Sequence, residues 1–315
     1  MHKIPMSETV SGAYNFAFKN FLSILGIAWF PYVLVGALLT AGVIEMMPSV
    51  ADINSDALMG AVAILNLIAL GAVAIVLIVV ASAMVNVGVM RQALGLHTGQ
   101  VFIYFSLGAA VWRMIGALLL AVIAIYALII ACVLVIVLVC TAGVHVLGEG
   151  LAYTIGTIGG IAAFVFCIYA MVRLTYFIAP VVVAEERIGL GRAWELGKGN
   201  FWRIIGLLIA VTLPVGIAFN IIITTLMGTF PVDQVTPNMT PNDFFLLYSH
   251  YYTQSLSHMW PVLVIVELAY VVALTGLMNG AQATAYLYVT GKKTVAPPYV
   301  PPADVAPPPP GAAPA

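Results

Sequence analysis

The side chains that could do chemistry in this sequence are the few polar ones inside long apolar stretches. Arg173 and Glu267 are charged, and Asn220 follows Pro214 and Gly216 in a third stretch. A charge in the hydrocarbon of a membrane costs about 2.5 to 3.5 kcal/mol on insertion scales, so such residues face protein, water or the lipid headgroups. Arg173, Glu267 and Asn220 therefore form the candidate intramembrane polar site.

The sequence leaves two interpretations of Arg173 open. It lies near Pro180, at the end of its stretch, where its guanidinium can extend to the headgroups. It would otherwise face a protein or water-filled interior and be functional. Since a helix rises about 1.5 Å per residue, Arg173 and Glu267 should differ in depth by about 15–20 Å, and an ion pair between them is not expected. Glu267 is expected to be protonated, to hydrogen-bond a neighbouring helix or to line an outward-facing cavity.

Sequence motifs of enzymes and metal sites are absent. The chain has no G-x-S-x-G elbow, no H-E-x-x-H, no P-loop and no intramembrane pair of aspartates. Glu185 and Glu186 begin like the E-E-x-x-x-R motif of an intramembrane protease, but Leu190 stands where the arginine should be. His250 and His258 are farther apart than the i, i+4 spacing of helical metal ligands. We predict no catalytic residue, no metal site and no cofactor.

The composition requires lipid as the solvent for most of the chain. Its 315 residues are 63% hydrophobic and only 7% charged, with a mean hydropathy of +1.11. A soluble domain has about a quarter charged residues. The net charge of −1 leaves no basic surplus to neutralise nucleic-acid phosphates. The expected partners are therefore membrane lipids, and nucleic acid is not one of them.

Six apolar stretches are long enough for a helix to cross the hydrocarbon core, which takes about 20 residues. They are Phe21–Ile44, Ala57–Met90, Met114–Leu147, Gly150–Pro180, Ile204–Phe230 and Pro261–Val289. Unpaired backbone groups are intolerable in hydrocarbon, and the alternation typical of a β-barrel is absent. Residues 21–290 are therefore predicted as an all-α, polytopic bundle of six transmembrane helices.

Basic residues give the orientation, because cytoplasmic loops retain lysine and arginine. Ten of the 11 lysine and arginine residues lie on the same side of the predicted spans. This side holds the two terminal segments, the connection between the second and third spans, and the connection between the fourth and fifth spans. The ten are Lys3, Lys19, Arg91, Arg113, Arg187, Arg192, Lys198, Arg203, Lys292 and Lys293. The other connections hold acidic residues instead. Both termini are therefore predicted to be cytoplasmic.

A short motif recurs at intervals of 90 residues. Its copies are Asn20–Gly26, Ala110–Gly116 and Asn200–Gly206, each preceded by an aromatic residue, namely Tyr14, Tyr104 or Trp194. If the repeat is real, the chain has three units, at residues of about 7–95, 98–188 and 189–291. Each unit contains one interfacial helix and two spans, and an axis along the membrane normal relates the units to one another. Coincidence in a low-complexity apolar sequence is the alternative.

The interfacial helices have an amphipathic pattern. In residues 1–20, a cytoplasmic N-terminal helix is predicted from apolar residues at helical spacing opposite a polar face. Its apolar residues are Val10, Ala13, Tyr14, Ala17, Phe18 and Phe21, and its polar residues are Glu8, Ser11, Asn15 and Lys19. Gly189–Asn200 repeats the pattern, so both helices are expected in the headgroup plane. The candidate interface motif is Arg192, Trp194, Lys198, Asn200, Trp202 and Arg203.

The run from Pro180 to Arg203 resembles a signature of proteins related to the membrane domain of glycerophosphodiester phosphodiesterases. A proline and acidic residues close one span, and a Trp-x-Leu elbow leads into the next, although Ala193 and Gly197 replace the expected hydroxyl residues. The resemblance implies a six-helix prokaryotic domain of the inner membrane, in a family whose stand-alone members are largely uncharacterised. The phosphodiesterase activity is not carried over, because no soluble phosphodiesterase domain is expected in this chain.

Two further segments have readable patterns. Thr240 to Asp243 is typical of a helix start, with Thr240 as the cap and Pro241 in the first turn, and an aromatic interfacial helix is expected to follow. Residues 291–315 are rich in proline and alanine and are predicted to be a disordered cytoplasmic tail.

The leading functional hypothesis is a non-enzymatic scaffold or accessory protein, because distinctive sequence gathers at the cytoplasmic interface. It would bind lipids, or protein partners through the elbow helices or the tail. The alternative is a transporter or channel for a small or lipidic substrate, with Arg173, Glu267 and a helix broken at Pro214 beside Asn220. Proline in membrane helices usually produces only a kink. A membrane-embedded lipid enzyme is a third class, for which no set of catalytic residues converges.

Overall fold

The computed structural model describes residues 3–51, 57–97, 103–228, 235–236 and 239–292. Within these ranges every regular element is an α-helix and none is a strand, which confirms the predicted all-α class. The helices are α1 (Met6–Lys19), α2 (Phe21–Ala51), α3 (Ala57–Ala93), α4 (Ala109–Leu147), α5 (Glu149–Thr175), α6 (Ile178–Ala184), α7 (Leu190–Leu196), α8 (Phe201–Met227) and α9 (Pro241–Thr290). The predicted tail from residue 293 onward lies outside the described residues.

The chain is a multi-pass membrane protein with six helical segments long and apolar enough to cross a bilayer. They are Phe21–Leu39, Ile64–Ala93, Ala109–Val146, Glu149–Ala184, Phe201–Met227 and Met259–Thr290. These segments coincide with the six predicted stretches to within several residues at most ends. Length and hydropathy predict them because each span must bond its own backbone and present apolar side chains to lipid.

The fourth span differs from the prediction because it is broken between α5 and α6, at Tyr176 and Phe177. Proline clashes with the carbonyl of the residue four positions earlier, which for Pro180 is that of Tyr176. Pro180 itself lies in the first turn of α6, where a helix does not need its N–H groups. The span therefore does not end at Pro180 but turns at Tyr176 and Phe177 and continues to Ala184.

The last span differs as well, because it is part of one helix of 50 residues. Thr240 accepts a hydrogen bond from the Asp243 backbone at 3.2 Å, in a reciprocal capping box, so the predicted helix start is confirmed. The aromatic segment and the sixth span, predicted separately, are continuous through Pro261. The Tyr251 hydroxyl donates to the carbonyls of Met227 and Gly228 at 3.1 and 2.9 Å, and so caps the end of α8.

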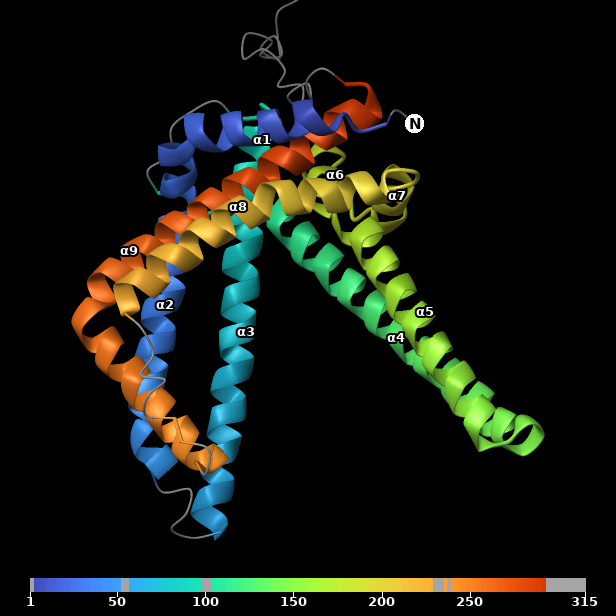
Figure 1. The fold of residues 1–315 in the computed structure, drawn as a ribbon. Helices are drawn as coiled ribbons and strands as arrows, with labels where there is room; N and C mark the ends of the chain where they lie inside the picture. The colour runs from blue at the N-terminus through green and yellow to red at the C-terminus, as the bar shows by residue number, and fades with distance from the viewer. Residues whose placement is uncertain (1–2, 52–56, 98–102, 229–234, 237–238, 293–315) are drawn as a thin grey trace, which may run out of the picture.

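The α4–α5 hairpin packs against the other spans at one end only. There, α6 contacts α3, α4, α7 and α9, and six of its seven residues, Ile178 to Val183, are buried. Figure 1 shows α1, α6 and α7 at this end, together with both described ends of the chain. We call it the cation-bearing end, because nearly all described cations lie there. They are carried by residues 3–19, the end of α3, the starts of α4 and α8, the segment from Glu185 to Asn200, and Lys292.

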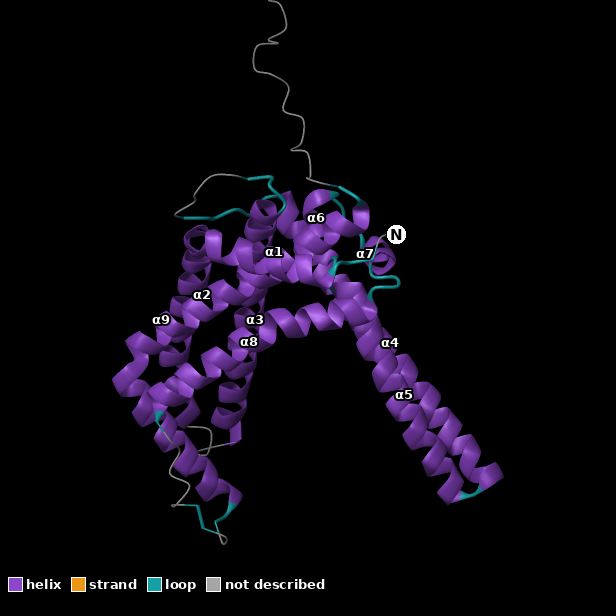
Figure 2. Cartoon of the chain, turned by 45° about the horizontal axis from the view of Figure 1, so that its top comes forward, coloured by secondary structure: helices purple, strands orange, loops and turns teal. Residues whose placement is uncertain are grey.

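Away from this end the spans diverge. The hairpin of α4 and α5 leans away from α2, α3 and α9 in both orientations, as Figure 1 and Figure 2 show. Beyond Ala121, no described residue of α4 is buried. Such exposed apolar surface would be intolerable in water but is ordinary where lipid is the solvent.

Helix α1 lies across α8 and α9, as expected of an interfacial helix, but its buried face is narrower than predicted (Figure 1). Ala13 and Ala17 are buried, whereas Phe18 is 70% exposed. Ala13 packs on Gly280, and Ala17 on Gly276, at distances that leave no room for side chains on these glycines. Small residues spaced four apart allow such close approach of membrane helices.

The repeat stays a prediction, and the structure offers one local likeness between two of its units. Asn20 and Asn200 join an interfacial helix to a span with similar backbone angles, φ −107° and ψ 15° against φ −116° and ψ 8°. The helix expected before the third span is not found, because residues 103–108 are not helical. The start of that unit, residues 98–102, lies outside the described residues.

Candidate functional site

Arg173 is buried where α5 meets α7 and does not extend to the headgroups. Its side chain is enclosed by protein, with the residue 6% exposed. One guanidinium nitrogen donates to the Tyr169 hydroxyl at 2.6 Å, and another donates to the Trp194 carbonyl at 2.8 Å. The guanidinium carbon also lies 4.0 Å from the centre of the Trp194 ring, a cation–π contact. The structure therefore shows Arg173 facing protein, while a function for it stays a prediction.

This arrangement gives Arg173 a structural role at the end of α7. A helix of seven residues is too short to be stable alone, and its last carbonyls lack partners within the helix. Arg173 supplies a donor and a positive charge to this end, where the helix dipole is negative. A Cβ on Gly197 would lie 3.4 Å from the backbone of Arg173, at van der Waals distance, so α7 packs directly on α5 at this position.

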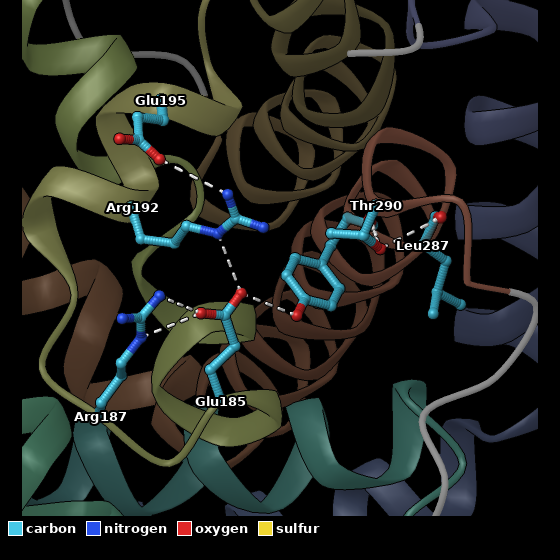
Figure 3. A network of polar contacts seen from close by, with 7 residues as sticks. Glu185, Arg187, Arg192, Glu195, Leu287 and Thr290 are labelled. Atoms are coloured by element: carbon cyan, nitrogen blue, oxygen red, sulfur yellow. Dashed lines mark hydrogen bonds and ion pairs between the residues drawn. The ribbon is translucent and has the colours of Figure 1, made fainter.

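A second polar cluster surrounds Glu185, just beyond the fourth span (Figure 3). Its carboxylate accepts hydrogen bonds from Arg187 at 2.6 and 3.0 Å, from Arg192 at 3.2 Å and from the Tyr286 hydroxyl at 3.2 Å. Arg192 also bonds to Glu195 at 3.5 Å. The cluster ties the α6–α7 connection to the last turns of α9. Burial opposes ionisation of Glu185, but the bonds to Arg187 and Arg192 outweigh it and lower the pKa of this carboxyl.

Replacing Glu185 by glutamine is expected to lower the free energy of unfolding by about 1 to 2 kcal/mol at neutral pH, because Arg187 and Arg192 then face a neutral amide in place of a carboxylate. A lowered pKa in the folded state stabilises the protein above the ordinary carboxyl value of 4.5. The difference between wild type and Glu185→Gln should therefore persist from pH 7 to pH 5 and shrink as the pH falls below that value. Thermal unfolding in mild detergent measures it.

The matched control is Glu195→Gln, since among the described side chains Glu195 pairs with Arg192 alone and its own side chain is 62% exposed. Exposed pairs contribute about 0 to 1 kcal/mol, so this variant should unfold near the wild-type temperature. If both variants unfolded at the same temperature, and that temperature differed from the wild type by the same amount at every pH, the role given to Glu185 would be contradicted.

The predicted interface motif divides into inward and outward residues. Asn200 is 2% exposed, and its side-chain oxygen accepts from the Ile4 backbone N–H at 3.1 Å. Arg203 donates to the Ile4 carbonyl at 2.7 Å. Lys198 is exposed, and Trp202 is 79% exposed. The start of α8 therefore holds the N-terminal segment in place while presenting Trp202 outward.

A groove of about 890 Å³ lies between α5 and the start of α8. Lys3, Trp202 and Arg203 line it at the cation-bearing end, and Tyr169 lines it beside them. Its remaining lining is apolar or glycine, from Ala162, Val165, Phe166, Ile168, Gly199, Phe201 and Ile205. Among the described lining residues none is acidic, so the groove combines an apolar surface with uncompensated positive charge.

Glu267 and Asn220 are not brought together with Arg173. Glu267 is exposed on α9, and no hydrogen bond or ion pair joins it to a described residue. Asn220 is exposed on α8 and lines a separate groove of about 410 Å³ with Tyr270 of α9. Helix α8 continues through Pro214 without a break. The three residues of the candidate intramembrane polar site therefore lie at three separate places, and the expectation that Arg173 and Glu267 form no ion pair agrees with the structure.

Sequence reasoning missed Lys3 and Tyr169 at the groove and Tyr286 in the Glu185 cluster. Tyr169 stands four residues before Arg173 on one helix face, which was a readable signal. Lys3 and Tyr286 come from distant parts of the chain and gave none. In the described part of the chain, no group of three or more histidine, cysteine, aspartate or glutamate residues lies close enough to hold a metal ion.

Comparison with protein-family models, curated proteins and solved structures found no match to this chain. The class of protein is therefore defined by the fold alone, as a multi-pass helical membrane protein.

Proposed function

We propose that the chain is a non-enzymatic scaffold or accessory protein of a bacterial inner membrane that binds lipids or protein partners at its cation-bearing end. By the positive-inside rule, the cations at this end support a cytoplasmic orientation of this end and of both termini. The resemblance of residues 180–203 to the glycerophosphodiester phosphodiesterase membrane domain remains a prediction, and no activity is built on it.

One observation carries the proposal. The packed core and the polar clusters lie at the cation-bearing end, while the spans beyond it present apolar side chains. A fold organised in this way has a rigid, charged face at the headgroup level and little polar surface in the hydrocarbon. Such a face suits the recognition of anionic lipid or of a partner at the interface.

The test is to compare what co-purifies with the wild type and with variants of this face. Substitution of Trp202, Lys198 and Arg203 by alanine, and separately removal of the tail from residue 293, should change the bound lipid or the co-purifying proteins. Glu267→Gln, on an exposed site of α9, is the control and should change neither. Unchanged lipid and partners in every variant would count against the proposal.

A transporter or channel is the second candidate, favoured by the groove that Asn220 lines between α8 and α9. It lacks the shared site that transport needs, because neither Arg173 nor Glu267 lines this groove or the one between α5 and α8. Uptake into proteoliposomes that Asn220→Leu abolishes would support this candidate over the scaffold.

A further inference from the structure

We infer that the groove between α5 and α8 binds one anionic phospholipid, with its phosphate at Lys3 and Arg203 and an acyl chain along α5. This inference rests on the proposed function, since it names the lipid class and the place where the cation-bearing end would hold it.

The charge in the groove selects for an anion. Lys3 and Arg203 line it, and the described lining contains no carboxylate to neutralise them. Neither residue takes part in an ion pair among the described side chains. Arg203 bonds to the Ile4 carbonyl at 2.7 Å, which fixes the segment that carries Lys3 beside it. Two neighbouring cations at headgroup depth suit a phosphate, which accepts several charged hydrogen bonds.

The remainder of the groove selects for a lipid over a soluble anion. Ala162, Val165 and Phe166 continue the lining down α5, for about 10 Å between Ala162 and Tyr169 by the helical rise. This part lies on a membrane span and is apolar, so it fits an acyl chain. Trp202 is 79% exposed where the groove opens at the cation-bearing end. Tryptophan is enriched at this depth of a membrane, among the lipid headgroups.

Tyr169 connects the groove to the buried Arg173. Its hydroxyl accepts a hydrogen bond from the Arg173 guanidinium at 2.6 Å, so its own hydrogen remains available to donate. A donor polarised by a cation in this way is stronger than an isolated hydroxyl. Tyr169 can therefore donate to a phosphate or ester oxygen of a lipid in the groove, and Arg173 adds positive potential from behind.

The experiment uses the purified full chain in nanodiscs of phosphatidylcholine with a minor fraction of phosphatidylglycerol that carries a photoactivatable acyl chain. Cross-linked peptides are mapped by mass spectrometry. A parallel sample carries the same probe on phosphatidylcholine. The variants are Lys3→Glu and Arg203→Gln, and the control is Lys19→Gln with Arg91→Gln, which removes two exposed cations at the same end outside the groove.

We expect phosphatidylglycerol to cross-link within residues 162–169 and 201–205 in preference to the phosphatidylcholine probe. Each groove variant should lower this yield about fivefold or more, since a cation near an anionic headgroup contributes about that factor. The control should change it less than twofold. Lys3→Glu keeps the test valid if Arg203→Gln disturbs folding, because Lys3 makes no hydrogen bond or ion pair with the described residues.

Equal cross-linking of both probes, or phosphatidylglycerol cross-links that the groove variants do not reduce, would overturn the inference. If phosphatidylglycerol is preferred but cross-links elsewhere at the cation-bearing end, this groove is excluded while the proposed function stands. If neither a lipid preference nor a co-purifying partner is found for the wild type, the proposed function fails together with the inference.

Discussion

Replacing Arg173 by lysine is expected to destabilise the protein more than replacing it by methionine. Lysine leaves a buried ammonium that cannot reach both the Tyr169 hydroxyl and the Trp194 carbonyl or lie flat on the Trp194 ring. Methionine loses the same contacts but leaves no charge to desolvate. We expect the free energy of unfolding to fall by about 3 kcal/mol with lysine and by about 1 to 2 kcal/mol with methionine.

The order of the two variants distinguishes the possible positions of Arg173. An arginine that reached the headgroups would be replaced by lysine at little cost, so a wild-type unfolding temperature for Arg173→Lys would contradict the buried site. Arg113→Lys is the control, since Arg113 is partly exposed. Its ion pair with the exposed Glu186 is long, at 3.7 Å, and is therefore weak. This variant should change the free energy of unfolding by less than about 0.5 kcal/mol. Unfolding is followed by tryptophan fluorescence in mild detergent.

The second large effect is expected where α1 crosses α9. A Cβ on Gly280 would lie 3.1 Å from the Ala13 Cα and 3.3 Å from its carbonyl oxygen. Backbone atoms cannot rotate away, so Gly280→Leu should force α1 off α9 and lower the free energy of unfolding by about 3 kcal/mol or more. Hydrogen exchange measured by mass spectrometry should find the amides of residues 6–19 protected in the wild type and unprotected in the variant.

Gly160→Leu in α5 is the matched control, since a Cβ there would meet nothing within 4 Å. Leucine is also a better helix former than glycine, so this variant should be as stable as the wild type. If Gly280→Leu retained both the wild-type unfolding temperature and the protection of α1, the close crossing would be refuted.

The spans could be predicted from the sequence because each depends on local composition. Phe21 begins α2, and Thr240 caps α9, as the apolar pattern and the cap chemistry indicate. Two further features were readable but not used. Pro180 marks the break four residues earlier, and Gly276 with Gly280 forms a small-xxx-small pair that predicts a close helix crossing.

The candidate site could not be predicted in the same way, because it depends on how distant segments fold back. Arg173 meets the Trp194 carbonyl only because α6 and α7 turn the chain back on α5. Lys3 reaches the groove because Asn200 and Arg203, almost 200 residues later, hold Ile4 on both sides. Periodicity places a side chain on a helix face but does not identify the helix that this face contacts.

Single-cysteine labelling tests most directly the central claim, that the packed, cation-bearing end faces the cytoplasm. Cys132, Cys140 and Cys167 would first be replaced by alanine, and a cysteine introduced at Thr240 or at Lys198, both exposed. With a membrane-impermeant thiol reagent, we predict that Thr240→Cys is labelled in intact cells and Lys198→Cys only after lysis. Labelling of Lys198→Cys in intact cells, with Thr240→Cys protected until lysis, would contradict the claim.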